Sequence, residues 1–307
     1  MRVFVTGGTG YVGVPVVDAL VRAGHEVVVL ERAGSIRPIQ RPDVARVTGD
    51  VTDHDALRHG MRGCDAVVHL VGIIREFPRR GVTMQRMHVD ATEAVLAAAQ
   101  AAGVSRVVHM SALGARPDAV SSYHRTKWMA EELVRSSGLP YTIFRPSVIF
   151  GRGGPGPQFV GQLADLVRSA PVVPVIGDGR FALQPVAVAT VAEAIVQAVH
   201  EPRDTAYELG GPDVITYLEI LRRIADALGK PLRTVRVPVV LMRGVVPLLE
   251  RLPSFPITRD QLTMLLEGNV CTDADAAYQD LYLEPIPFTV TPGLVRRAGG
   301  RESAGWM

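Results

Sequence analysis

Short apolar runs alternate with longer amphipathic segments in the first half of the chain. The runs are rich in β-branched residues, which predicts strands over residues 3–6, 26–30, 44–49, 66–70, 106–111 and 141–145. Between them, apolar positions recur at helical spacing and predict helices over residues 12–23, 53–61, 89–102 and 123–136. Since the strands are almost continuously apolar, as buried parallel strands are, the pattern predicts an α/β fold with a doubly wound parallel sheet.

The pattern changes after residue 150. A glycine- and proline-rich loop over residues 151–157 precedes predicted helices over 159–168, 191–200 and 218–228 and short strands over 173–175, 207–209 and 235–237. We therefore predict a first domain over residues 1–150 and a smaller part over 151–307 that binds a substrate or a partner. Some segments, at about 172–210, are expected to return to the sheet of the first domain.

A glycine-rich turn joins the first strand to the first helix, with glycines at positions 7, 10 and 13. Glycines let backbone N–H groups approach a pyrophosphate at a helix N-terminus, where the helix dipole favours negative charge. Because the turn follows a strand and opens a helix, it predicts a Rossmann-type dinucleotide site rather than a tight turn without a ligand. The residues predicted to contact the cofactor here are Gly7, Thr9, Gly10, Tyr11, Val12 and Gly13.

The end of the second strand bears on the choice between NAD and NADP. An acidic residue there bonds the adenine ribose hydroxyls of NAD, whereas an arginine pairs with the 2′-phosphate of NADP. Glu31 and Arg32 stand together at this place, so they favour opposite cofactors. Because Arg37 and Arg41 follow, we slightly prefer NADP(H) over NAD(H), with Arg32 contacting the phosphate.

Other strand ends add candidate cofactor contacts. Asp50 and Val51 follow the third strand, and the Asp50 carboxylate could accept a hydrogen bond from the adenine amino group. Helix capping is the alternative role for Asp50, although Asp53 is better placed to cap. Val71 and Gly72 follow the fourth strand, where a small residue lets a cofactor lie over the edge of the sheet.

Tyr123 and Lys127 are four residues apart on a predicted helix and share one of its faces. A nearby ammonium favours the phenolate and lowers the pKa of a tyrosine from its usual value of about 10. Tyr123 could then exchange a proton with a substrate oxygen while hydride moves to or from carbon. Ser111, at the end of the fifth strand, could hold the same oxygen. An ordinary amphipathic helix also explains the spacing, but the order of glycine turn, serine, tyrosine and lysine favours catalysis.

Composition narrows the class of protein. The net charge of +2, from 33 basic and 31 acidic residues, argues against nucleic acid as a partner. Cys64 and Cys271 form neither a disulfide framework nor a zinc pattern, so we expect a reducing cytoplasm and no metal. The apolar run at residues 3–5 is short for a secretory signal, and we find no stretch of about 18 uncharged apolar residues, so we expect neither a signal nor a membrane-spanning helix. The histidines at positions 69, 88 and 109 are expected to be strand or loop residues rather than ligands.

Together these motifs resemble the short-chain dehydrogenase/reductase superfamily, in its extended or atypical branch, over nearly all of residues 1–230. The resemblance rests on the glycine turn, on Ser111, Tyr123 and Lys127, and on residues 49–53 and 145–151. Residues 71–74, 110–115, 141–146 and 258–262 look most like the group around the nucleotide-binding accessory subunit of respiratory complex I.

The resemblance implies further site residues, and the chain departs from the family pattern at one loop. It implies that Lys127 also holds the nicotinamide ribose and that residues 146–149, with Pro146 and Val148 among them, line the nicotinamide side. The shorter enzymes of the superfamily have an Asn-Asn-Ala-Gly loop where this chain has His69, Leu70, Val71 and Gly72. The chemistry of that loop is therefore left open.

Three functions are consistent with these residues. The first is an NAD(P)-dependent oxidoreductase acting on a carbonyl or alcohol of a nucleotide-sugar, isoprenoid or quinone-like molecule, bound beyond the carboxyl edge of the sheet. The second is a non-catalytic NAD(P)H-binding structural or sensor subunit of a membrane-associated complex. The third is a sugar-nucleotide epimerase or dehydratase, which extra acid–base residues beside the nicotinamide would favour. The sequence leaves the oligomeric state open.

The mean hydropathy of +0.18 is slightly apolar, and the excess is concentrated over residues 235–252. Pro238 and Pro247 make a continuous helix there unfavourable. We interpret the segment first as core of the smaller part or as a lid over an apolar ligand. The alternative is a surface that docks on a membrane or a partner subunit, which would make a cytoplasmic protein peripheral to the inner face of the membrane.

Overall fold

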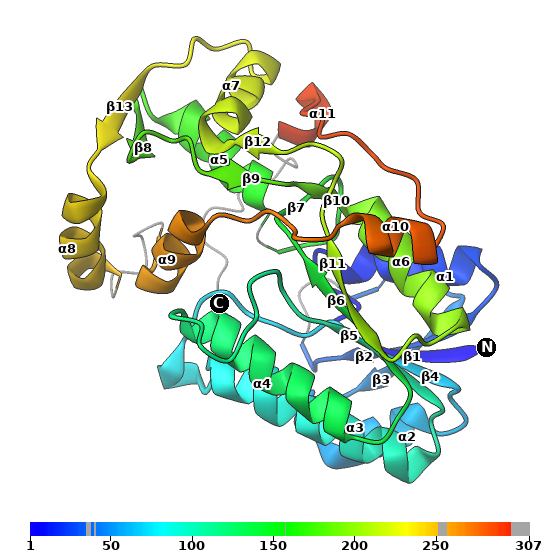
Figure 1. Ribbon diagram of the computed structural model, residues 1–307. Coiled ribbons are helices and arrows are strands. Elements are labelled where there is room, and N and C mark those ends of the chain that lie inside the picture. The colour runs from blue at the N-terminus through cyan, green and yellow to red at the C-terminus, as the bar shows by residue number, and fades with distance from the viewer. Residues whose placement is uncertain (35–37, 40, 157, 251–256, 296–307) are drawn as a thin grey trace.

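The computed structural model describes residues 1–34, 38–39, 41–156, 158–250 and 257–295 (Figure 1). Its centre is a sheet of seven parallel strands in the order β11-β6-β5-β4-β1-β2-β3. The crossover between β1 and β4 and the all-parallel pairing confirm the predicted Rossmann-type, doubly wound fold. The strands are β1 (Arg2–Thr6), β2 (Glu26–Glu31), β3 (Val44–Thr48), β4 (Ala66–His69), β5 (Arg106–Met110), β6 (Tyr141–Pro146) and β11 (Thr205–Leu209).

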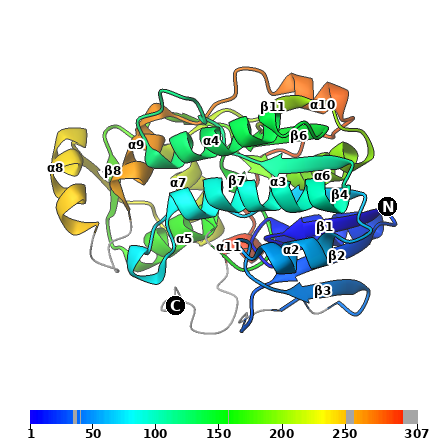
Figure 2. The same ribbon diagram turned by 90° about the horizontal axis from the view of Figure 1, so that it is seen from below.

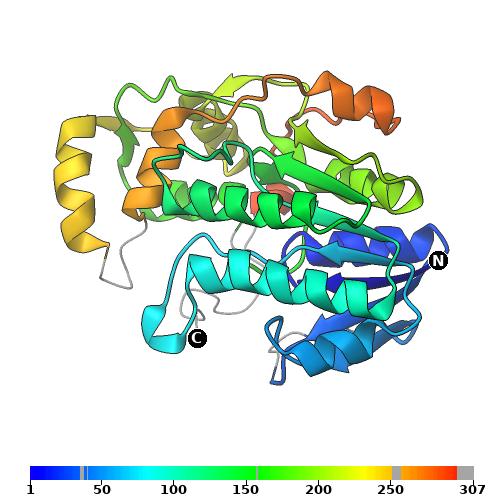
Figure 3. The ribbon, with the colours of Figure 1, turned by 60° about the horizontal axis from the view of Figure 1, so that its bottom comes forward.

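Helices cover both faces of this sheet (Figures 1 and 3). One face packs on α1 (Gly13–Arg22) and α6 (Val188–His200), and the other on α2 (His54–Met61), α3 (Ala91–Ala102) and α4 (Ser122–Ser136). Alternate buried residues of β1 pack in the two cores: Val3 and Val5 face α1, whereas Phe4 faces α2 and α3. This burial on two faces explains why the strands are continuously apolar in sequence.

A second apolar core lies beyond the carboxyl edge of the sheet. Phe150, Leu163, Ile220 and Phe288 are among its buried members. The elements that build it are α5 (Phe159–Ser169), β8 (Val173–Ile176), β9 (Ala182–Leu183), β12 (Ile215–Thr216), α7 (Tyr217–Ala227), β13 (Thr234–Val237) and α11 (Pro292–Val295), while β7 (Ile149–Phe150) pairs with β10 (Val186–Ala187) at its border. Residues 172–210, some of which were expected to return to the first sheet, are divided between the two cores. Their α6 and β11 pack in the core of the seven-stranded sheet, whereas β8 pairs with β13 in the second core.

The expectation that prolines interrupt a helix over residues 235–252 is confirmed at Pro238, which separates β13 from the following helix, and is wrong at Pro247. The segment forms α8 (Val239–Leu249), followed by α9 (Arg259–Glu267) and α10 (Asp275–Asp280). Pro238 occupies the N-cap, where a missing N–H costs nothing, and Pro247 lies in the last turn. Val246 is fully buried against Ile176 and Leu262, and this packing offsets the single helical hydrogen bond that Pro247 cannot make.

Candidate functional site

The glycine turn is too tight for side chains at its closing position. Gly7 adopts a φ of 76°, and its carbonyl accepts a hydrogen bond from the Gly10 N–H at 3.0 Å. A Cβ on Gly13 would lie 2.0 Å from the Gly7 oxygen and 2.7 Å from Gly8, so only glycine can open α1 there. The first turn of α1 has no acidic residue, and its N-cap Val12 has no capping side chain. The turn and the helix N-terminus thus present the backbone donors that suit a pyrophosphate.

The loop after β7 packs directly on this turn. The Tyr11 hydroxyl donates to the Gly151 carbonyl at 3.1 Å, and the Gly154 N–H donates to the Tyr11 carbonyl at 2.9 Å. A Cβ on Gly153 would lie 2.3 Å from the Tyr11 ring. The sequence predicted this segment as a loop by composition, and the close approach to Tyr11 explains why Gly153 carries no side chain.

Three arginines were expected near the adenine ribose, and two of them, Arg32 and Arg41, lie among the described residues. Arg32 is described and exposed, whereas Arg37 lies outside the described residues. Arg41 turns back to donate to Asp18 and Asp43, at 2.6 Å in each case. Its charge is therefore compensated within the protein, which weakens the argument that led us to prefer NADP(H).

Asp53 caps the following helix, whereas Asp50 closes the turn before it. Asp53 caps α2, as predicted, by accepting from the N–H groups of residues 55 and 56 at 3.0 and 3.1 Å. The Asp50 carboxylate accepts from the N–H and hydroxyl of Thr52 and closes the turn before that helix. Val51 is buried in the core with Phe4, so only its backbone could contact a cofactor.

Lys127 reaches the carboxyl edge of the sheet from α4. Its Nζ donates to the Met110 carbonyl at 3.0 Å, and a Cβ on Gly72 would lie 2.9 Å from the same atom. The structure thus brings together Lys127 and Gly72, which are 55 positions apart. Burial lowers the pKa of Lys127 to about 8, against an opposing effect of Glu131, so the ammonium persists at neutral pH.

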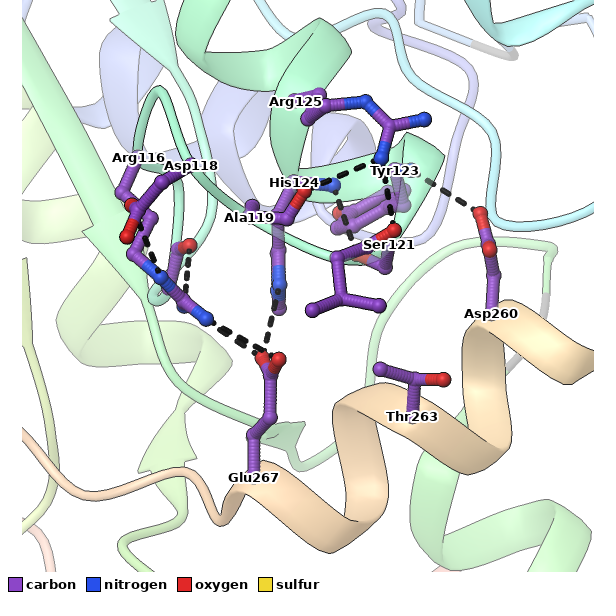
Figure 4. Close-up of polar contacts among 12 residues, drawn as sticks. Arg116, Asp118, Ala119, Ser121, Tyr123, His124, Arg125, Asp260, Thr263 and Glu267 are labelled. Atoms are coloured by element: carbon purple, nitrogen blue, oxygen red, sulfur yellow. Dashed lines mark hydrogen bonds and ion pairs between the residues drawn. The ribbon is translucent and has the colours of Figure 1, made fainter. Parts of the chain in front are cut away.

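Tyr123 is the second residue of α4, and its N–H donates to Asp260 of α9 at 3.2 Å (Figure 4). Its ring meets the His88 ring edge-on, with the centroids 5.4 Å apart. Burial raises the pKa of Tyr123 to about 12, so the lowering expected from Lys127 is wrong for this arrangement. The Lys127 ammonium donates to the Met110 carbonyl, so desolvation is the main influence on the pKa of the Tyr123 phenol. The Tyr123 hydroxyl is therefore protonated at neutral pH.

Ser111 is buried, and its hydroxyl donates to Glu131 at 2.6 Å. Glu131 is fully buried on α4, where Arg145 binds both of its oxygens at 2.8 and 2.6 Å and Arg135 binds one at 2.6 Å. To hold a substrate oxygen, the Ser111 hydroxyl would have to turn away from Glu131. Its predicted role therefore stays a prediction.

Pro146 and Val148 lie beside Ser111 at the same edge. The Ser111 N–H donates to the Phe144 carbonyl at 2.7 Å, and the Leu113 N–H donates to the Pro146 carbonyl at 3.0 Å. The Val148 N–H donates to the side chain of Asn269 at 2.7 Å. The ends of β5 and β6 are thus held side by side, next to the ends of β1 and β4.

His88 lies beside Tyr123 and Lys127, and the expectation that it is a strand or loop residue is wrong. It lies in a π-helical segment, η2 (Gln85–Asp90), just before α3; π-helical turns are frequent at functional sites. Its Nε2 lies 3.1 Å from the Ile73 N–H and its Nδ1 2.8 Å from the Thr126 hydroxyl. Burial, with help from Lys127, lowers the pKa of His88 to about 2, so the imidazole is neutral. Its place just before a predicted helix, at the carboxyl edge of the sheet, is the signal that could have identified it.

We expect a pH signature from Lys127. An unfolded lysine keeps its proton up to about pH 10.4, whereas the folded Lys127 releases it near pH 8. The unfolded chain therefore binds more protons in this window, and the free energy of unfolding should rise with pH by up to about 3 kcal/mol. Urea denaturation of the wild type and of Lys127→Met between these pH values measures the effect. If the free energies of unfolding of the wild type and of Lys127→Met change with pH in parallel, Lys127 does not have the lowered pKa assigned to it.

Comparison with known proteins agrees with this geometry. A model of the NAD dependent epimerase/dehydratase family matches residues 3–210. Over 301 residues the chain is 29% identical to the mitochondrial NADH dehydrogenase (ubiquinone) 1 alpha subcomplex subunit 9 of Arabidopsis thaliana, which covers 92% of this chain and 73% of the relative. It is 32% identical over 240 residues to the ceramide reductase of Caulobacter vibrioides, covering 77% of this chain and 73% of the relative.

Among solved structures, the chain is similar to the UDP-glucose 4-epimerase of Thermus thermophilus in complex with NAD. The TM-score is 0.65 at 22% identity, covering 78% of this chain and 86% of the other, which supports the fold. The family match extends over two thirds of the chain and includes the glycine turn, Tyr123 and Lys127. The chain therefore belongs to the NAD-dependent epimerase/dehydratase family, in the extended branch of the short-chain dehydrogenase/reductase superfamily.

Proposed function

We propose that the protein is an NAD(P)H-dependent reductase of a carbonyl compound, with Tyr123 as the proton donor. The observation that carries this proposal is geometric: Tyr123 lies one turn before Lys127 on α4, and the buried Lys127 Nζ reaches the edge of the sheet where the glycine turn lies. A carbonyl oxygen needs a proton as its carbon accepts hydride, and a phenol with a pKa near 12 is in the donating form at neutral pH. In this proposal Lys127 orients the ribose and Ser111 holds the substrate oxygen.

When bound, the cofactor supplies the hydride, and the protein binds and orients it. In the proposed arrangement the glycine turn holds the pyrophosphate and Arg32 lies near the adenine ribose. Asp50 and Val51 lie near the adenine, and five further residues lie near the nicotinamide. The five residues near the nicotinamide are Val71, Gly72, Lys127, Pro146 and Val148. We keep the slight preference for NADP(H), which now rests on Arg32 alone.

We propose an apolar carbonyl substrate. The ceramide reductase relative is named for a lipid, and it aligns with 77% of this chain. The part beyond the carboxyl edge of the sheet has its own apolar core, and it would close over such a substrate. A sugar-nucleotide epimerase is the weaker proposal, because the similarity to the epimerase of Thermus thermophilus supports the fold alone.

A non-catalytic NAD(P)H-binding role, on a membrane-associated complex, is the second candidate. The NADH dehydrogenase subunit aligns with 92% of this chain, more than the reductase does. Both candidates predict cofactor binding, and only the first predicts turnover. Oxidation of NADPH or NADH against a panel of ketones with long alkyl chains distinguishes them.

Cofactor binding itself should be visible as stabilisation. NADH or NADPH at about 100 times its Kd should raise the free energy of unfolding by roughly 2.7 kcal/mol, which shifts the Tm by several degrees. Differential scanning fluorimetry measures the shift, and Gly13→Val, which places atoms on the Gly7 carbonyl, is the negative control. If neither dinucleotide shifts the wild type, both candidate functions are wrong.

A further inference from the structure

Three exposed aliphatic side chains lie on one side of α8. Val240, Leu241 and Leu248 are 82%, 54% and 77% exposed, and all three lie with Gly244 within about 100° of the helix circumference. The opposite side of the helix packs through Val246 on Ile176. Figures 1 and 2 show α8 at the end of the molecule opposite the N-terminus. We call the surface formed by these three side chains and Gly244 the α8 face.

The charge around the α8 face is one-sided. Between Asp226 and Asp260 the sequence has six basic residues and a single acidic one, Glu250. The basic residues are Lys230, Arg233, Arg236, Arg243, Arg259 and Arg251, of which Arg251 lies outside the described residues. The Glu250 carboxylate already accepts from the Arg259 N–H at 2.8 Å. Arg233, Arg236 and Arg243 are exposed and have no ion pair among the described residues.

We propose that the α8 face docks on an anionic lipid bilayer. Exposed aliphatic side chains flanked by arginines match the interface of such a bilayer, where the apolar groups enter the acyl boundary and the arginines contact lipid phosphates. A two-fold dimer through the same face would set these arginines against their own copies. No helix of the described chain has the length and apolar character to span a bilayer, so the contact is peripheral.

A pocket borders α8 on the side opposite the α8 face, and its link to Tyr123 rests on the proposed function. A pocket of about 530 Å³ lies between α8 and α9 and is lined by Val246, Leu262 and Val120. Val120 immediately precedes the N-cap of α4, and Asp260 of α9 accepts the Tyr123 N–H (Figure 4). Docking through the α8 face would therefore bring this pocket, on the other side of the same helix, close to the bilayer surface.

Flotation with vesicles of phosphatidylcholine and phosphatidylglycerol, in a three-to-one ratio, tests the proposal. The wild type should float with these vesicles and not with pure phosphatidylcholine. Val240→Ser with Leu248→Ser should weaken binding about tenfold or more, and Arg236→Ser with Arg243→Ser about 20-fold. Added salt should weaken the wild type as well.

Matched controls separate this surface from general effects. Val214→Ser removes an aliphatic side chain that is 55% exposed elsewhere, and Arg22→Ser with Arg46→Ser removes the same charge from other exposed positions. Both controls should float like the wild type. Equal loss in the controls, binding to pure phosphatidylcholine, or no flotation of the wild type would overturn the docking proposal. A cofactor-induced Tm shift that persists in the α8 variants shows that the proposed function is unaffected.

Discussion

Tyr123→Phe should lower the rate of carbonyl reduction by about 10²–10⁴-fold while the cofactor-induced stabilisation stays unchanged. The substitution removes only the hydroxyl, which is the proposed proton donor and which makes no hydrogen bond to a described residue. The ring contact with His88 and the main-chain hydrogen bond to Asp260 remain. Steady-state NADPH oxidation against a reducible ketone, together with a thermal-shift titration, measures both quantities.

Tyr217→Phe is the matched control for this variant. Tyr217 is also a buried tyrosine, stacked on Phe181 in the second core, and burial raises its pKa to about 12 as well. The control should keep the activity of the wild type. If Tyr123→Phe retains activity, Tyr123 has no acid–base role; if the wild type binds cofactor but reduces no ketone in a broad panel, the binding-only function is favoured.

The fold could be predicted because its signals are local. Apolar runs, helical spacing and the glycine turn each span fewer than about 15 residues, and a parallel sheet aligns the ends of its strands at one edge. That is why Gly13, Gly72 and Lys127 could be assigned to one edge before any contact was known. Gly72 and Lys127 do lie together there.

Other parts of the site depend on contacts that no local pattern encodes. His88 borders Tyr123 and Lys127 from a π-helical segment, whose irregular spacing hides where the helix begins. The predicted helix begins at residue 89, inside this segment, whereas α3 begins at Ala91. The pKa of Tyr123 depends on desolvation by residues far apart in the chain, so a pairing argument from the i, i+4 spacing predicted the wrong direction. Pro247 shows the same limitation, because the packing of Val246 outweighs a local helix-breaking signal.

Glu131→Gln should destabilise the fold by about 3 kcal/mol. The fully buried carboxylate accepts from Ser111, Arg135 and Arg145. The neutral amide leaves Arg145 without its counter-charge and Arg135 with Glu132 alone, and it adds donors where only acceptors are needed. Glu132→Gln is the control: its neighbouring carboxylate is half-exposed and pairs with Arg135 alone, so its loss should cost less than about 1 kcal/mol. Urea denaturation at pH 7 compares the two variants.

The same variant should also change the site, since Glu131 opposes the burial that lowers the pKa of Lys127. Without that negative charge the pKa of Lys127 falls further, and the ammonium is lost at a lower pH. Activity that depends on the charged Lys127 should therefore decline at lower pH in Glu131→Gln than in the wild type or in Glu132→Gln. A pH–rate profile measures this shift. If Glu131→Gln is destabilised but its profile is unmoved, Glu131 stabilises the fold without acting on Lys127.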